Sequence, residues 1–103
     1  MKVSFHPDFP EDVRRFRTTY QEISGPLGTR FQSEIGAAIE AIKQSPTGAG
    51  HFLNFGTNIV HDIRRRNLRA FPFFVVYGLT EDMLIFGSVV PSRSDPLTWL
   101  IQF

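Results

Sequence analysis

The feature that most constrains this chain is a change in hydrophobic spacing near its middle. In the first half, large apolar residues recur at intervals of three and four, which places them on one stripe of a helix. In the second half, they stand in short runs rich in aromatic and β-branched residues, which favour strands. A chain of 103 residues must bury both patterns in one core. We therefore expect a single domain over residues 1–103 that packs helices against a sheet.

Two successive stripes in the first half predict two helices. The first stripe consists of Phe9, Val13, Phe16, Tyr20 and Ile23, and the second of Leu27, Phe31, Ile35, Ala38 and Ile42. We expect Asp8 to cap the first helix, residues 24–26 to end it, and the short break to impose an antiparallel hairpin. Gly36 costs the second helix roughly 0.5–1 kcal/mol relative to alanine. Close approach of a neighbouring element should offset that cost.

Strands are predicted at residues 59–68, 73–79 and 83–90, after a short strand at residues 2–6. The turns between the last three are so short that these strands must be antiparallel. Residues 47–57 are rich in glycine, and we expect a loop there. The predicted fold class is α+β in the order β-α-α-β-β-β: an N-terminal strand, then an antiparallel helical hairpin packed on a small, mainly antiparallel sheet.

The composition excludes several classes of function. The net charge is only +1, so attraction to nucleic acid would need a local patch such as the four arginines within residues 64–69. Cysteine is absent, which removes disulfides, thiolate zinc sites and cysteine nucleophiles and fits a reducing cytoplasm. The three histidines lack a metal-binding spacing, and no apolar run is long enough to cross a membrane. We expect a cytoplasmic protein without metal or cofactor.

Four segments, taken in order, resemble the RelE/ParE superfamily of bacterial toxins. They read FHPDFPEDV at residues 5–13, GPLGTRFQSEI at 25–35, IRRRNLRAFPFFVVY at 63–77 and SRSDPLTW at 92–99. The resemblance covers nearly the whole chain. It implies a type II toxin that inhibits growth or stabilises a plasmid, and that a cognate protein antitoxin neutralises in a hetero-oligomer. RelE-like members are similar to ribosome-dependent messenger RNA nucleases, whereas ParE-like members are associated with poisoning DNA gyrase.

The choice between these two activities depends on a few residues. Metal-independent RNA cleavage needs a base, a cation clamp for the phosphate and an acid. Arg69 and Arg93 match positions where RelE-like nucleases carry arginine, and we expect them at one side of the sheet. His61 is the one histidine suited to proton transfer, although an exposed strand histidine without a mechanistic role is the simpler interpretation. Both arginines are also compatible with ordinary surface positions.

The tail departs from the nuclease pattern. Where RelE-like nucleases tend to place a tyrosine or histidine, the candidate positions hold Pro91 and Trp99, and neither can exchange a proton in that chemistry. Ser94 stands where family members often have another arginine. We therefore favour a ParE-like toxin that inhibits DNA gyrase by binding. A RelE-like ribonuclease and a non-toxic antitoxin-binding module remain as alternatives.

Partner-binding residues are predicted from exposed basic and apolar positions. Eleven phenylalanines are too many for so small a core, so Phe52 and Phe55 are candidates for a partner-facing surface, with anchoring of their own loop as the alternative. The apolar tail at Trp99 either packs on the sheet or offers a strip to a partner. A strand alternates its faces, so Arg64, Arg65 and Arg66 form either a solvated edge or an acceptor for an acidic antitoxin segment or a nucleic acid backbone.

Overall fold

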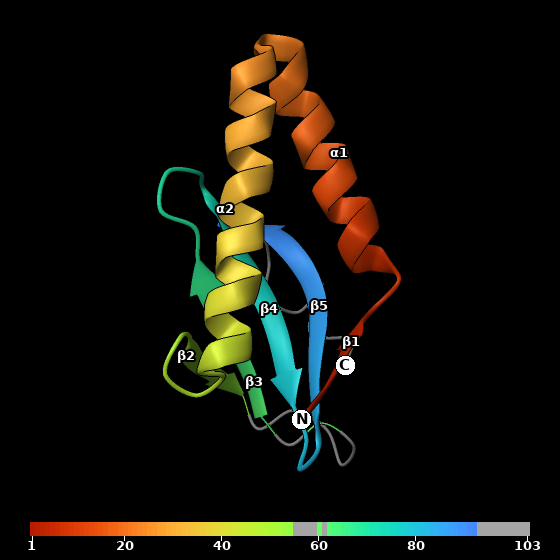
Figure 1. Cartoon of the computed structure of the whole chain (residues 1–103), viewed down its shortest axis with the longest axis vertical. Helices are drawn as coiled ribbons and strands as arrows, with labels where there is room; N and C mark the ends of the chain where they lie inside the picture. Colours follow the sequence, from red (N-terminus) through yellow and green to blue (C-terminus); the bar gives the residue numbers. More distant parts are fainter. Residues whose placement is uncertain (55–59, 61, 93–103) are drawn as a thin grey trace.

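The computed structural model describes residues 1–54, 60 and 62–92, and within them the chain is α+β, as predicted (Figure 1). The elements run in the order β1 (Lys2–Phe5), α1 (Asp8–Ile23), α2 (Gly25–Gln44), β2 (His51–Asn54), β3 (Asp62–Asn67), β4 (Phe73–Leu79) and β5 (Met83–Pro91).

The strands of the described residues form one sheet in the order β1-β5-β4-β3-β2. Strands β2 to β5 pair antiparallel with their neighbours. β1 instead pairs parallel with β5, from Lys2 opposite Met83 to Phe5 opposite Phe86. The helical hairpin between β1 and β2 makes this parallel pairing possible, because it carries the chain across the sheet. The sheet is thus mainly antiparallel, and β1 and β2 form its two edges.

The glycine-rich segment that we predicted as a loop contains strand β2. It pairs with β3, with a bulge between Phe52 and Asn54. The segment is drawn toward β3 by side chains: Arg64 donates to the carbonyl of Thr47 at 3.1 Å and Arg66 to that of Ala49 at 2.6 Å. These contacts come from residues more than a dozen positions away. A pattern read within the segment itself therefore could not reveal the strand.

The turn of the helical hairpin is shorter than predicted, and the two helices diverge away from it (Figure 1). A single residue, Ser24, separates the two helices, and its hydroxyl accepts the N–H of Leu27 at 3.1 Å. Gly28 packs against α1, where a Cβ atom would stand 2.9 Å from that of Gln21. The close approach expected at Gly36 is wrong, since a Cβ atom there would meet nothing within 4 Å. The glycine that permits the hairpin is Gly28.

The predicted cap of the first helix is also wrong. Asp8 is the first residue of α1, and Pro7 occupies the N-cap position without a side-chain cap hydrogen bond of its own. The N–H of Asp8 donates to Nδ1 of His6 at 3.1 Å. Asp8 therefore lies inside the helix and not at the N-cap position. The side chain of His6 accepts one of the backbone N–H groups that the first turn leaves free.

The main core lies between the helical hairpin and one face of the sheet, and a smaller cluster covers the other face. All seven residues of β4 are buried, as expected for a central strand with both faces covered. Aromatic rings dominate the main core. The ring centroids of Phe31 and Phe71 lie 5.3 Å apart in an edge-on arrangement, and those of Tyr77 and Phe86 lie 6.5 Å apart. In Figure 1 the two helices meet beyond the end of the sheet and diverge as they run back across it.

Candidate functional site

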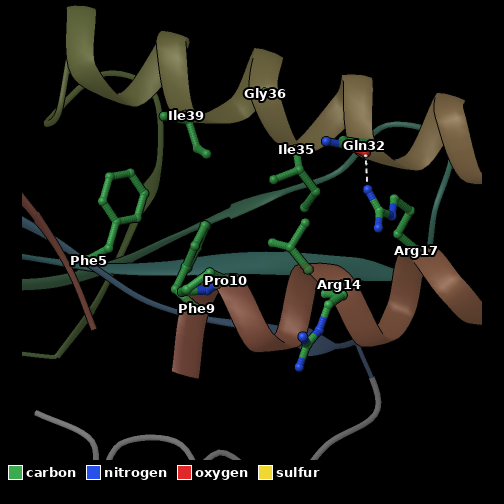
Figure 2. Close-up of a pocket in the computed structure, with 10 residues that line it drawn as sticks. Phe5, Phe9, Pro10, Arg14, Arg17, Gln32, Ile35, Gly36 and Ile39 are labelled. Carbon is green, nitrogen blue, oxygen red and sulfur yellow. Dashed lines mark hydrogen bonds between the residues drawn. The ribbon is translucent and has the colours of Figure 1, made fainter. Parts of the chain in front are cut away.

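A groove of about 760 Å³ lies between α1 and α2 where the helices diverge (Figure 2). Its lining is mostly apolar and comes from β1, α1 and α2: Phe5, Phe9, Pro10, Val13, Ile35 and Ile39. Phe5 stands at one end and remains 45% exposed although it stacks on Phe86 at 4.8 Å. An apolar hollow of this size at the surface is a feature that often serves binding.

The polar groups of the groove lie mainly on its α1 side and are cationic. Arg14 pairs with Glu11, one turn earlier on the same helix. Arg17 donates to the side-chain oxygen of Gln32 at 2.9 Å, and Figure 2 shows this contact at the end of the groove opposite Phe5. The Nε atom of Arg17 is buried without a hydrogen-bond partner among the described residues. None of the described residues that line the groove is acidic.

The opposite wall of the groove is formed by α2, and Gly36 lies in its middle. Its backbone is unobstructed, because no atom lies within 4 Å of the place a Cβ would take. Glycine is therefore not required at this position by the packing of the described residues. Its effect is to leave the groove open at its centre.

The α1 wall is anchored to the sheet by Asp12. The carboxylate accepts the N–H of Val89 at 3.2 Å and pairs with Arg15 at 3.3 Å. Burial raises the pKa of Asp12 above its ordinary value, against the opposing effect of the Val89 hydrogen bond and the Arg15 charge. The contact with Val89 bridges residues 77 positions apart, and it fixes α1 where the groove opens.

The arginines of β3 divide between the two faces of the sheet. Arg64 and Arg66 stand opposite Tyr77 and Val75, both of which belong to the core under the helices. Arg64 also pairs with Asp62 at 3.1 Å and lies 5.8 Å from the ring of Phe52. Arg65 faces the other way, with its guanidinium 5.1 Å from the ring centroid of Phe74. The structure thus brings Phe52 and Arg64 together, and all three arginines already have contacts within the chain.

Arg69 lies in the turn between β3 and β4, and this turn is held by α2. One carboxylate oxygen of Glu34 accepts the backbone N–H of Arg69 at 2.9 Å and that of Ala70 at 3.1 Å. Among the described residues, nothing pairs with the guanidinium of Arg69. Glu34 and Arg69 also line a small hollow of about 60 Å³ together with Arg66. Glu34 therefore positions the turn, a role that the sequence pattern did not suggest.

Tyr77 is the largest fully buried side chain among the described residues. Its hydroxyl donates to the carbonyl of Pro46 at 2.6 Å. Burial raises the pKa of this phenol to about 12, so it stays protonated near neutral pH. Tyr77 holds the chain after α2 against the sheet and is not placed to exchange protons with a ligand.

Four predicted site residues lie outside the described residues: His61, Arg93, Phe55 and Trp99. The predicted pairing of Arg69 with Arg93 and His61 therefore stays a prediction. Sequence reasoning missed Arg17, Gln32 and Glu34 because each acts through a partner on another element. Gly36 was the one signal of the groove that the sequence carried, as a glycine that the helix pattern does not explain.

Within the described parts of the chain, neither a metal site nor a membrane-spanning helix is found. No three histidine, cysteine or carboxylate side chains in residues 1–54, 60 and 62–92 gather closely enough to hold a metal ion. In those same residues, neither helix combines the length and apolarity required for a membrane crossing.

Comparisons with known proteins identify the fold. The chain superposes with a TM-score of 0.72 on a chain from the structure of the chromosomal ParDE toxin–antitoxin system from P. aeruginosa, over 90% of this chain and 97% of that one. The fold is therefore that of the ParE/RelE-like toxins. The two sequences share 15% identity. No family model matches this sequence, and no curated protein does.

Proposed function

We propose that this protein is the toxin of a type II toxin–antitoxin pair and that it acts as ParE-like toxins do, by binding DNA gyrase. A cognate protein antitoxin would neutralise it in a hetero-oligomer. The observation that carries the proposal is the fold, which matches a chain of a ParDE system over 90% of the length of this chain. Toxicity, growth inhibition and plasmid stabilisation follow from this assignment.

Inhibition by binding is favoured over bond breaking by the surroundings of Arg69. Cleavage of RNA without a metal needs a base and an acid beside the cation that holds the phosphate. The carboxylate that holds this turn, Glu34, already accepts two backbone N–H groups. The phenol of Tyr77 is buried and stays protonated. Neither group fits a proton-transfer role beside Arg69.

The test is expression of the chain alone in a bacterial host, followed by an assay with the purified protein. We expect growth arrest with filamentation and DNA-damage signalling, relieved when the protein encoded by the adjacent reading frame is co-expressed. Purified protein should inhibit plasmid supercoiling by gyrase. Transcripts cut in a translating extract, with cutting abolished by Arg93→Ala, would instead support the ribonuclease alternative. Harmless expression with tight antitoxin binding would support the non-toxic module.

A further inference from the structure

We propose that the turn between β3 and β4 contacts the target through Arg69, whose guanidinium pairs with a carboxylate of DNA gyrase, and that Glu34 of α2 positions this arginine. The inference rests on the proposed function for the identity of the target. The site itself follows from the rigidity of the turn, from a guanidinium that the described chain does not use and from the charges around it.

The turn between β3 and β4 is anchored at both ends and exposed at its tip. The N–H of Leu68 donates to the carbonyl of Phe73 at 2.9 Å, which closes the turn. Phe71 is buried, and its ring centroid lies 5.3 Å from that of Phe31. Arg69 is exposed between these anchors and is the one charged residue within residues 68–72. The turn therefore presents a single charge on an ordered backbone.

Glu34 fixes the tip of the turn from α2, beside which the turn lies in Figure 1. One carboxylate oxygen accepts the N–H of Arg69 at 2.9 Å and that of Ala70 at 3.1 Å. Successive backbone N–H groups form a concave site of the kind that binds anions. Because Glu34 already fills this site, the backbone of the turn is not free to bind another anion. Recognition of an anion here therefore depends on the side chain of Arg69.

The guanidinium of Arg69 has no ion pair or hydrogen bond within residues 1–54, 60 and 62–92. Arginine binds a carboxylate through two parallel hydrogen bonds, in a geometry that its planar group already holds. Because the backbone of the turn is ordered before binding, less entropy is lost when such a pair forms. Arg69 thus offers a partner an available guanidinium whose position Glu34 has set.

The charges around Arg69 favour a single carboxylate over a nucleic acid backbone. Duplex DNA carries one negative charge per roughly 1.7 Å of its axis, and its binding depends on several neighbouring cations. Here Glu34 lines the same small hollow as Arg69 and Arg66, so a negative charge stands beside the free guanidinium. The net charge of the whole chain is only +1. This surface therefore suits one carboxylate of a protein better than a row of phosphates.

The turn and the groove lie on different stripes of α2. Glu34 and Ala38 line the hollow at the turn, whereas Ile35, Gly36 and Ile39 line the groove. Substitutions at the turn therefore leave the lining of the groove unchanged. Affinity for the antitoxin encoded beside this gene serves as a second readout that distinguishes the two surfaces.

The experiment measures binding of purified DNA gyrase without DNA, by calorimetry, to wild-type protein and to variants. Arg69→Ala removes the guanidinium, Glu34→Ala removes the contact that positions it, and Glu34→Gln keeps an oxygen that can accept the two N–H groups. The double variant Glu34→Ala, Arg69→Ala completes a cycle. Lys43→Ala and Glu40→Ala are the matched controls: both residues are exposed on α2, pair with each other and do not line the hollow. Circular dichroism melts verify that each variant is folded.

We expect the dissociation constant for gyrase to rise about tenfold or more for Arg69→Ala and about fivefold for Glu34→Ala. Glu34→Gln and the two controls should change it less than about threefold. In the Arg69→Ala background, Glu34→Ala should add nothing further, because a positioning residue acts only through the arginine. A glutamate that merely supports the fold would weaken binding in both backgrounds, and that result would overturn the role given to Glu34.

Three other results would overturn the contact itself while the proposed function stood. These are equal gyrase affinity of wild type and Arg69→Ala, a loss confined to binding of a short DNA duplex, and a loss confined to binding of the antitoxin. A wild-type protein that neither binds gyrase nor inhibits supercoiling would remove the proposed function, and the inference with it.

Discussion

The arginines of β3 and Arg17 of the α1–α2 groove differ in how far their hydrogen-bonding groups find partners within the described chain. Arg64 and Arg66 donate to carbonyls of the segment after α2, and Arg65 lies over the ring of Phe74. Arg17, by contrast, contacts one neutral side chain and keeps a buried donor unpaired among the described residues. The arginines of β3 thus make contacts that support the fold, whereas Arg17 keeps hydrogen-bonding capacity that the described chain does not use. The role of Arg64, Arg65 and Arg66 in partner binding stays a prediction.

The largest effect expected from this comparison is on stability. Arg66→Ala removes a charge-assisted hydrogen bond to the carbonyl of Ala49 and should lower the free energy of unfolding by about 1.5–3 kcal/mol. Arg17→Ala should change it by less than about 0.5 kcal/mol. Urea unfolding of both variants measures the difference. Equal losses would show that the two arginines are used alike.

Tyr77→Phe tests the other contact that holds the segment after α2. The change leaves the carbonyl of Pro46 without the hydroxyl that now donates to it at 2.6 Å. We expect a loss of about 1–2 kcal/mol in the free energy of unfolding. Because the ring stays in place, antitoxin affinity should not change. A variant as stable as wild type would mean that this hydrogen bond adds nothing to the fold.

The two glycines of α2 should respond to alanine in opposite directions. Gly36→Ala should raise the free energy of unfolding by about 0.5–1 kcal/mol, because the helix gains propensity and the Cβ meets nothing. Gly28→Ala should lower it, since its Cβ would stand 2.9 Å from that of Gln21. Thermal melts of the pair provide the measurement. Destabilisation by Gly36→Ala would contradict the open groove.

The smallest effect concerns the α1 anchor. Burial raises the pKa of Asp12 in the folded protein above its ordinary value of 3.8. The protonated carboxyl therefore favours folding, and this contribution to stability is complete at a pH below 3.8. It is lost as the pH rises through the pKa of the folded protein. Asp12→Asn keeps an oxygen for the N–H of Val89 but carries no charge. The variant should therefore gain stability relative to wild type between about pH 3 and pH 7. Melting temperatures across this range would reveal the opposite trend if burial were not the dominant cause.

The fold was predictable because its periodicities are local. Five apolar residues at intervals of three and four predict each helix. The seven-residue apolar run of β4 predicts the central strand. Strand β2 was missed because it pairs with β3, which lies farther along the chain. The groove was missed for the same reason. Its walls come from elements that the sequence separates, and Gly36 was interpreted as a point of close packing, which is wrong.

The candidate site was less predictable than the fold. The sequence drew attention to Arg64, Arg65 and Arg66, whose partners within the chain appear only once the strands are placed. It gave no reason to select Arg17 among nine arginines. Incomplete hydrogen bonding is a property of the folded neighbourhood, so no spacing pattern encodes it. The roles of His61, Arg93, Phe55 and Trp99 stay predictions.

Amide hydrogen exchange of the purified protein, with and without DNA gyrase, tests the central claim most directly. The account predicts that gyrase slows exchange in residues 68–72, the turn that carries Arg69, more than in α1 at Asp8–Ile23. Slowed exchange confined to α1, with unchanged rates in the turn, would contradict it.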